Sequence, residues 1–319
     1  MKHQISIVGK FLNEDKIPEI KKLAAEGEFE LQIFKDRKEA EGKLSDTEII
    51  FTDDVLMMAE AKEAVWCASV SSGVDHILKA GAIGANTVLT GGAGSYGITI
   101  SEHVIGVIIS LLRNFPEYAK RIERGEWKGG LPVNSIYKSN ILIMGTGDIG
   151  KTVATRLRGF QPEKIIGFNR SGRNTAEFDQ ICMSKDLDSK IKISDIIILA
   201  LPATAETENI FDENRISMMK KSAIIVNVGR GQALDEEALA DALNNHKIRG
   251  AAIDVTKIEP LPRDSKLWEA ENLILTPHIS GWMTLSHTKD KSTEMFCNNL
   301  KRYIKGQKLH GIIDIKKGY

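Results

Sequence analysis

Three isolated polar side chains in the second half of the chain have the types that reduction of a ketone requires. Arg230, Glu259 and His278 each follow a short apolar run, and such runs are typical of parallel strands. Ligands bind at the carboxyl ends of parallel strands, so the three side chains are expected to share one edge of a sheet. There Arg230 would hold a carboxylate and polarise a neighbouring ketone, His278 would protonate the forming alkoxide, and Glu259 would keep His278 protonated. Taken singly, each would be an ordinary surface or structural residue.

A glycine-rich loop precedes these residues in the chain. The apolar run 141–144 leads into Gly145-Thr146-Gly147-Asp148-Ile149-Gly150, and a stretch with helical spacing follows. In this setting the first glycine makes the tight turn, the second admits a pyrophosphate against the backbone, and the third packs helix on strand. The helix N-terminus then offers its N–H groups to the phosphates. A glycine turn without a ligand is the alternative, but the flanking strand and helix favour a dinucleotide site.

The end of the next predicted strand, 164–168, indicates which dinucleotide binds. NAD-binding chains commonly have a carboxylate there for the adenosine ribose. Here Asn169-Arg170-Ser171-Gly172-Arg173 contains no acid, and Arg170, Ser171 and Arg173 are suited to bind a 2′-phosphate. The sequence therefore favours NADP(H), with NAD(H) as the second option. A solvated basic turn is the alternative interpretation.

Composition excludes several classes of partner. The chain of 319 residues has 43 Lys and Arg against 43 Asp and Glu, so neither a nucleic acid nor an anionic membrane is expected as a partner. No stretch approaches the roughly 20 apolar residues of a transmembrane helix. The three cysteines, Cys67, Cys182 and Cys297, lie far apart without a CxxC pair. We therefore expect a cytoplasmic protein with no metal site and no disulfide framework.

Short Ile- and Val-rich runs alternate with charged segments of helical spacing, which predicts an α/β protein with parallel sheets covered on both faces. The predicted strands are Ile5–Val8, Phe29–Phe34, Glu48–Phe51, Val65–Val70, Val88–Leu89, Ile141–Met144, Lys164–Phe168, Ile196–Leu199, Ala223–Asn227, Gly250–Asp254 and Leu273–Leu275.

Two helical segments set the predicted domain boundaries. The first, Ser101–Arg124, is expected to be a linker helix capped by Ser101. The second runs from Ser292 to Tyr303 and has one apolar face, which a return to the first domain would bury. This predicts a substrate domain made of residues 1–100 and 287–319, with a nucleotide-binding domain, 101–286, inserted in it.

Five blocks spread along the chain carry a family resemblance. They are Ser72–Ile77, Gly145–Gly150, Asn227–Gly231, Asp254–Val255 with Glu259–Pro262, and Thr276–Gly281. Together they resemble the D-isomer-specific 2-hydroxyacid dehydrogenases, and the lack of an acid at 169–171 is similar to their NADPH-dependent glyoxylate and hydroxypyruvate reductases. The resemblance implies two Rossmann or flavodoxin-like parallel-sheet domains, the nucleotide-binding one inserted in a discontinuous substrate-binding domain. It also implies a homodimer built around the inserted domain.

The resemblance further implies residue roles. Arg230 would bind and polarise the substrate, His278 would be its acid/base, and Glu259 would orient His278. Backbone N–H groups at Ser72 and Gly73 would bind the substrate carboxylate. The residues expected to bind the cofactor are Gly145, Thr146, Gly147, Asp148, Ile149, Gly150, Asn169, Arg170, Ser171, Arg173, Leu201, Pro202, Val228, Gly229, Arg230, Asp254 (near the nicotinamide amide), His278, Ser280 and Gly281.

The expected activity is NADP(H)-preferring reduction of a small 2-keto acid, such as glyoxylate or hydroxypyruvate, to the D-2-hydroxy acid. An NAD-dependent dehydrogenase acting on D-lactate, D-2-hydroxyisocaproate or phosphoglycerate is the alternative. A non-enzymatic dinucleotide sensor, similar to transcriptional corepressors, is less favoured. Two roles stay open for Trp282: with Tyr96 and Met283 it would narrow the substrate pocket, or it would pin the interdomain hinge.

Overall fold

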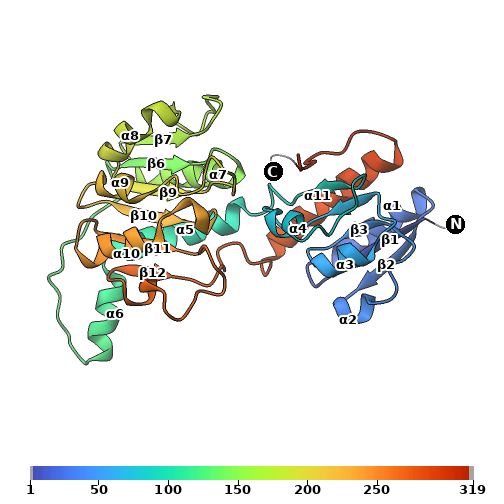
Figure 1. Cartoon of the computed structure of the whole chain (residues 1–319), viewed down its shortest axis with the longest axis horizontal. Coiled ribbons are helices and arrows are strands. Elements are labelled where there is room, and N and C mark those ends of the chain that lie inside the picture. The colour runs from blue at the N-terminus through green and yellow to red at the C-terminus, as the bar shows by residue number, and fades with distance from the viewer. Residues whose placement is uncertain (1–2, 316–319) are drawn as a thin grey trace. The chain divides into compact units, whose positions relative to one another are not determined.

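The computed structural model describes residues 3–315, which form two compact units (Figure 1). Residues 3–96 and 283–315 make up the split unit, and residues 97–282 make up the inserted unit. The chain leaves the split unit after Tyr96 rather than after residue 100, and returns at Met283 rather than at residue 287. Both crossings thus lie a few residues before the predicted ones.

The split unit is built on a parallel sheet in the order β2-β1-β3-β4-β5. Its strands are β1 Gln4–Val8, β2 Glu30–Phe34, β3 Thr47–Phe51, β4 Trp66–Ala68 and β5 Val88–Thr90. Its helices are α1 Ile17–Glu26, α2 Arg37–Ala40, α3 Val55–Glu60, α4 Asp75–Lys79 and α11 Ser286–Ile304. All of these strands overlap the predicted ones. Strands β1, β3 and β4 carry several buried apolar residues each, whereas β2 has only Phe34 and β5 only Leu89.

Successive residues of the strands bury into opposite faces of this sheet, as the two-residue period of a strand requires. In β3, Ile49 and Phe51 belong to one core with residues of α1 and α11. Ile50 between them belongs to the other core, with residues of α2, α3 and α4. The sheet is therefore covered on both faces.

Helix α11 completes the first of these cores. Phe296 stacks on Phe51 with ring centroids 4.4 Å apart, and it also stacks on Trp66 at 5.3 Å. Phe296, Cys297 and Leu300 are all buried. The apolar face that was recognised in the sequence is thus packed against the sheet formed by the first part of the chain.

The inserted unit contains a parallel sheet in the order β12-β11-β10-β9-β6-β7-β8 (Figure 1). Its strands are β6 Asn140–Met144, β7 Lys164–Phe168, β8 Gln180–Cys182, β9 Ile196–Leu199, β10 Ile224–Asn227, β11 Gly250–Ile253 and β12 Leu273–Leu275. Its helices are α5 Gly97–Leu112, α6 Phe115–Glu123, α7 Asp148–Leu157, α8 Leu187–Ile193, α9 Glu213–Ser217 and α10 Glu236–Asn244. The α/β class with parallel sheets is confirmed, but β8 was not predicted.

The predicted linker helix, Ser101–Arg124, is wrong at its start and in its continuity. Helix α5 begins at Gly97, and the Ser101 hydroxyl donates to the carbonyl of Ile98 inside the helix, so Ser101 is not its cap. The chain then bends by 65° between α5 and α6. Asn114 adopts a left-handed conformation (φ 56°) at the bend, and Pro116 occupies the first turn of α6.

None of the described helices is by itself long and apolar enough to cross a bilayer. Only α5 and α6 taken together, across their bend, reach the length and composition of such a span. More than half of the residues of α6 are polar or charged, and α5 packs against α7, β10 and β11 within the inserted unit.

Candidate functional site

The glycine loop lies between β6 and α7, at the carboxyl edge of the sheet of the inserted unit. Gly145 has φ +108°, and a Cβ added there would lie 2.4 Å from the carbonyl oxygen of Ala200. A Cβ on Gly150 would lie only 1.9 Å from the carbonyl oxygen of Gly145. By contrast, a Cβ on Gly147 would meet nothing within 4 Å, and Gly147 starts α7 without a side-chain cap. Gly145 and Gly150 thus pack against neighbouring backbone with no room for a side chain, whereas the space beside Gly147 is open. This arrangement fits a pyrophosphate at the helix N-terminus.

Asn169 organises the turn that follows β7. Its amide nitrogen donates to the Thr146 hydroxyl at 2.9 Å and to the Arg173 carbonyl at 3.0 Å, and its oxygen accepts from the Ser171 hydroxyl at 3.3 Å. The turn is thereby fastened to the glycine loop. Arg170, which is exposed, lies 3.8 Å from Glu206, whereas Arg173 forms no ion pair with any residue in the range 3–315. Two guanidinium groups and a hydroxyl are thus gathered on a turn that contains no acid.

Arg230 projects from a tightly packed loop after β10. Asn227, which is fully buried, accepts from the Gly229 N–H and donates to the Arg230 carbonyl, both at 3.1 Å. A Cβ on Gly231 would lie 2.0 Å from the backbone of Thr256, and one on Gly229 would lie 2.7 Å from the backbone of Leu201. The Arg230 guanidinium donates to the Gly229 carbonyl at 2.8 Å. The loops after β9, β10 and β11 are therefore in close contact at one edge.

Asp254, directly after β11, holds the loop that carries His278. Its carboxylate accepts from the Thr276 hydroxyl at 2.6 Å and from the N–H groups of Ile279 and Ser280, both at 2.9 Å. Burial would raise the pKa of Asp254, but the hydrogen bonds from Ser280, Thr276 and Ile279 outweigh it and lower the pKa. Asp254 is 2% exposed, and the described hydrogen bonds of its carboxylate go to this loop.

His278 and Glu259 form a hydrogen-bonded pair. His278 Nδ1 lies 2.7 Å from Glu259 Oε2, and the other carboxylate oxygen of Glu259 accepts from the Thr256 N–H at 3.0 Å. His278 is left-handed (φ 54°), and its N–H donates to the carbonyls of Asp254 and Thr276. The imidazole is about half exposed, and its Nε2 makes no hydrogen bond with any described residue. The pair therefore presents an oriented ring nitrogen that is available to a ligand.

In the split unit, Ser72 and Gly73 lie between β4 and α4. Both are partly exposed, and neither backbone N–H donates to a residue within 3–315. The residue before them differs, because the Ser71 N–H donates to the Ser69 hydroxyl and the Ser71 carbonyl accepts from the Gly92 N–H. Ser72 and Gly73 thus offer the two consecutive donors that were predicted for a carboxylate.

The remaining predicted residues take different positions. Ser280 is buried and bound to Asp254. The Asp148 carboxylate lies near Gly97 at the start of α5, 2.9 Å from the position of an added Cβ. Tyr96 is buried and donates its hydroxyl proton to the Val70 carbonyl at 2.9 Å, whereas the Trp282 side chain is 65% exposed. Ile149 lies in the first turn of α7, whereas Pro202, Val228 and Gly281 lie in the same loops as their predicted neighbours.

Several residues that shape these loops were not predicted as site residues. Asn227 braces the Arg230 loop, Glu206 pairs with Arg170, and Asp53 binds the serines beside Ser72. Asp53 follows an apolar strand, which is the same signal that indicated Arg230, whereas Asn227 is the last residue of β10 itself. Glu206 gave no such signal, because it lies in an irregular segment after β9.

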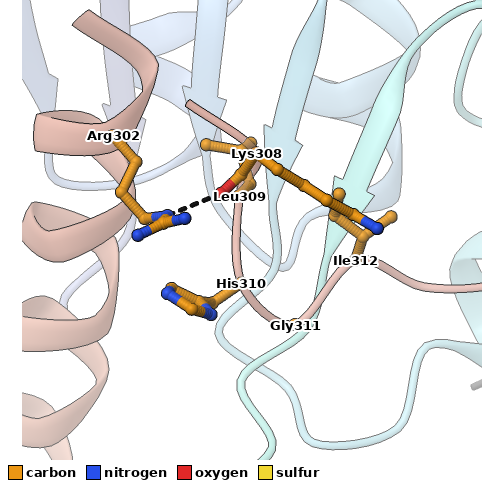
Figure 2. Close-up of a pocket in the computed structure, with 6 residues that line it drawn as sticks. All are labelled: Arg302, Lys308, Leu309, His310, Gly311 and Ile312. Carbon is orange, nitrogen blue, oxygen red and sulfur yellow. Dashed lines mark hydrogen bonds between the residues drawn. The ribbon is translucent and has the colours of Figure 1, made fainter. Parts of the chain in front are cut away.

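A pocket of about 330 Å³ in the split unit is separate from all of these residues. It is lined by Arg302, Lys308, Leu309, His310, Gly311 and Ile312 (Figure 2). Arg302 reaches across to donate to the Lys308 carbonyl at 2.5 Å. None of the predicted substrate or cofactor residues lines this pocket, so it is not the candidate site.

Comparisons with known proteins agree with this picture. The sequence model described as D-isomer specific 2-hydroxyacid dehydrogenase, NAD binding domain, matches residues 105–280. A protein of Dictyostelium discoideum named probable 2-ketogluconate reductase is 37% identical over 213 residues, which are 65% of this chain and 63% of that protein. Glyoxylate/hydroxypyruvate reductase B of Pectobacterium carotovorum subsp. carotovorum is 36% identical over 190 residues, 57% of this chain and 58% of that protein.

Each match thus covers less than two thirds of the relative's length. A solved structure gives a longer match. The D-isomer specific 2-hydroxyacid dehydrogenase family protein of Aeromonas salmonicida subsp. salmonicida superposes with a TM-score of 0.85 at 32% identity. That match covers 99% of this chain and 100% of the other.

Proposed function

Because the chain belongs to the D-isomer specific 2-hydroxyacid dehydrogenase family, we propose that it reduces a small 2-keto acid to the D-2-hydroxy acid with NADPH. The observation that carries this proposal is the His278–Glu259 pair, whose 2.7 Å hydrogen bond leaves Nε2 without a partner among the described residues. Glu259 follows β11 and His278 follows β12, and Arg230 and the glycine loop follow other strands of the same sheet.

The residues divide the work as follows. A nicotinamide cofactor, which the glycine loop 145–150 and the turn 169–173 would hold, would supply the hydride for the carbonyl carbon. Arg230 carries the positive charge that attracts the substrate carboxylate and stabilises negative charge developing on the ketone oxygen. His278 donates a proton from Nε2 to that oxygen, while Glu259 accepts from Nδ1–H and keeps the ring oriented for transfer. In the direction of oxidation, His278 accepts the proton of the hydroxyl group.

The preference for NADPH is supported by the turn 169–173. A 2′-phosphate carries negative charge and several acceptor oxygens, which suit the guanidinium groups of Arg170 and Arg173 and the hydroxyl of Ser171. A ribose-binding carboxylate would repel that phosphate, and the turn has Asn169 in its place. Asn169 also keeps the turn against the glycine loop through Thr146.

The substrate class is supported by Ser72, Gly73 and Arg230. The two backbone N–H groups of Ser72 and Gly73, which have no described acceptors, suit a carboxylate. The Arg230 guanidinium, taken by itself, suits a carboxylate or a ketone oxygen. The name of the Pectobacterium relative points to glyoxylate and hydroxypyruvate. We place these two among the preferred substrates of this chain.

A homodimer is part of the proposal. No residue of α6 is buried, although Phe115 and Ile122 on this helix are apolar and more than half exposed. Trp127, in the segment that follows, is 96% exposed. Apolar side chains gathered on one helix and its flanking segment mark an interaction surface, and a second copy of this chain is its proposed partner.

A reducing compartment such as the cytoplasm is the proposed location. Cys67, Cys182 and Cys297 are buried and free of disulfides. Burial raises the pKa of the Cys67 thiol to about 12 and that of Cys182 to about 11, so both stay protonated and unreactive.

Initial rates of cofactor oxidation test the proposal. Glyoxylate, hydroxypyruvate, pyruvate, a branched 2-keto acid and phosphohydroxypyruvate are each offered with NADPH and with NADH. The expected result is the highest kcat/KM for glyoxylate or hydroxypyruvate with NADPH. Equal or better rates with NADH would overturn the cofactor preference, and no oxidation with any keto acid would overturn the enzymatic function.

A further inference from the structure

In the loop that presents Ser72 and Gly73, backbone groups of the two preceding residues are held by hydrogen bonds. The Val70 carbonyl accepts from the Tyr96 hydroxyl, and the Ser71 carbonyl accepts from the Gly92 N–H at 2.8 Å. The Ser71 N–H donates to Ser69 Oγ at 3.1 Å. The fixed part of the loop therefore ends one residue before the two donors that lack described acceptors.

Asp53 is the group to which this fixed part is attached. It follows β3 directly after Thr52, whose N–H donates to the Ala68 carbonyl and whose hydroxyl donates to the Val8 carbonyl. One oxygen of Asp53 accepts from the Ser69 hydroxyl at 2.8 Å, and the other accepts from the Ser71 hydroxyl at 2.6 Å. His76 lies on α4, the helix that follows Gly73, and its Nε2 is 3.5 Å from Asp53 Oδ1. A single carboxylate thus binds the loop on both sides of its donors.

The ionised state of Asp53 determines the direction of these hydrogen bonds. Burial would raise the pKa of Asp53, but hydrogen bonds from His76, Ser71 and Ser69 lower it overall. A carboxylate can only accept, so both serine hydroxyl protons must point toward it. The lone pairs of Ser69 Oγ then remain to accept the Ser71 N–H, which turns that donor inward.

We propose that Asp53 is a positioning residue for substrate, which acts through Ser69 and Ser71 to hold the Ser72 and Gly73 N–H groups ready for the carboxylate of a 2-keto acid. This inference rests on the proposed function, because it concerns the substrate subsite of the same reaction. The role of Asp53 is to order the loop, and Asp53 itself does not touch the substrate.

Whether KM rises or falls when Asp53 is neutralised distinguishes a positioning residue from a carboxylate that does not order the loop. A negative charge near an anionic substrate repels it, so neutralising a carboxylate that does not order the loop would lower KM. Neutralising a positioning carboxylate raises KM instead, because an amide donates where a carboxylate accepts and must reverse one serine hydroxyl. Asp53→Asn is therefore the decisive variant, and Asp53→Ala removes the hydrogen bonds to both serines together with the contact to His76.

Asp54 supplies the matched control. It is the neighbouring acid and caps α3 by accepting from the Leu56 and Met57 N–H groups. Asp54→Ala is expected to lower stability through loss of the cap and of the ion pair with Arg37, without changing KM.

Steady-state kinetics with glyoxylate and NADPH give the first readout. For Asp53→Asn we expect KM for glyoxylate to rise about 10-fold, a factor that corresponds to about 1.4 kcal/mol. The expected change in kcat is less than about 3-fold, with NADPH affinity as in the wild type. An unchanged or lowered KM in Asp53→Asn would overturn the proposal, as would an equal rise in KM in Asp54→Ala.

A binding readout keeps the proposal testable if the chain proves to have no reductase activity. Oxamate, a 2-keto acid mimic, is titrated into the full ¹⁵N-labelled chain with NADP⁺ present, and the amide signals of Ser72 and Gly73 are followed. We expect shifts that saturate in the wild type and in Asp54→Ala but need about 10-fold more oxamate in Asp53→Ala. Shifts at equal oxamate in Asp53→Ala, or none in the wild type, would overturn the role of Asp53 independently of turnover.

Discussion

At the scale of single residues, His278 combines a left-handed backbone with a paired ring. A left-handed conformation costs a non-glycine residue roughly 1–2 kcal/mol, and here two hydrogen bonds from the His278 N–H help to hold it. The conformation is maintained where the ring must meet Glu259. Local strain is thus stored at the residue to which we assign proton transfer.

Removing the imidazole should stop turnover and leave cofactor binding intact. For His278→Ala we expect kcat/KM for glyoxylate to fall about 10²–10⁴-fold, the usual contribution of a positioned acid. NADPH affinity, measured by fluorescence of the bound cofactor, should match the wild type. His246 is a matched control, because it also has positive φ (51°) and lies 3.8 Å from a glutamate, Glu271. If His246→Ala lost as much activity as His278→Ala, the assignment of the acid would fail.

Asp254 should make the free energy of unfolding decrease at acid pH. Its pKa is lowered in the folded state, so its carboxylate stabilises the fold above the ordinary value of 3.8, and this stability is lost as the pH falls through the lowered folded pKa. Asp254→Asn should therefore be less stable by about 2 kcal/mol at pH 7, and the difference from wild type should shrink as pH falls below about 4. Urea unfolding at pH 3–7 measures this. Asp264→Asn, at an exposed acid, should follow the wild-type curve.

Arg230, Glu259 and His278 could be proposed as site residues from the sequence because each is a polar residue after an apolar strand, and parallel strands bring such ends to one edge. Asp53 follows β3 in the same way, yet it precedes a second acid, Asp54, and such a pair is typical of a solvated turn. Only the distances to Ser69 and Ser71 separate the two acids by role. Hydrogen bonds between loops distant in sequence leave no periodic signal.

At the scale of elements, the glycine loop depends on the contact between Gly150 and Gly145. Gly150→Ala places a Cβ 1.9 Å from a carbonyl oxygen, so α7 must move away from β6. We expect a loss of about 2 kcal/mol or more in unfolding free energy, together with weaker NADPH binding. Gly159→Ala is the control, because a Cβ there meets nothing within 4 Å. Similar losses in both variants would argue against the packing role of Gly150.

The elements that could be predicted are those whose own residues carry a clear apolar pattern, rather than those that form only by pairing with a neighbour. Ile196–Leu199 is a continuous apolar run, fully buried, and was predicted with the same bounds. Strand β8 has three residues, only Cys182 of them buried, and it pairs only with β7 at the edge of the sheet. Its existence depends on β7 rather than on its own composition. The break after α5 carried a signal in Pro116, but the continuous apolar spacing of Val104–Leu112 masked it.

At the scale of the whole molecule, the exposed apolar side chains around α6 predict self-association. In sedimentation experiments we expect the wild type at twice the chain mass of 35.3 kDa, and Trp127→Glu at the single mass. A charge at the centre of an apolar interface is costly to bury, whereas it is well solvated in a monomer. Ile193→Glu, at an exposed residue on α8, should leave the mass unchanged. A wild type of single mass would overturn the dimer.

The return of α11 to the first sheet also orders events during synthesis on the ribosome. Tyr303 in α11 donates to Glu48 in β3, which is 255 residues earlier, whereas residues 97–282 form a unit with no break in the chain. At about 5–20 residues per second, β3 waits tens of seconds for its partner helix. Through that interval Phe51 and Trp66 present an uncovered aromatic face, and the inserted unit is free to fold first. We therefore expect the aromatic face of the first sheet to stay exposed on the nascent chain until α11 has been synthesised.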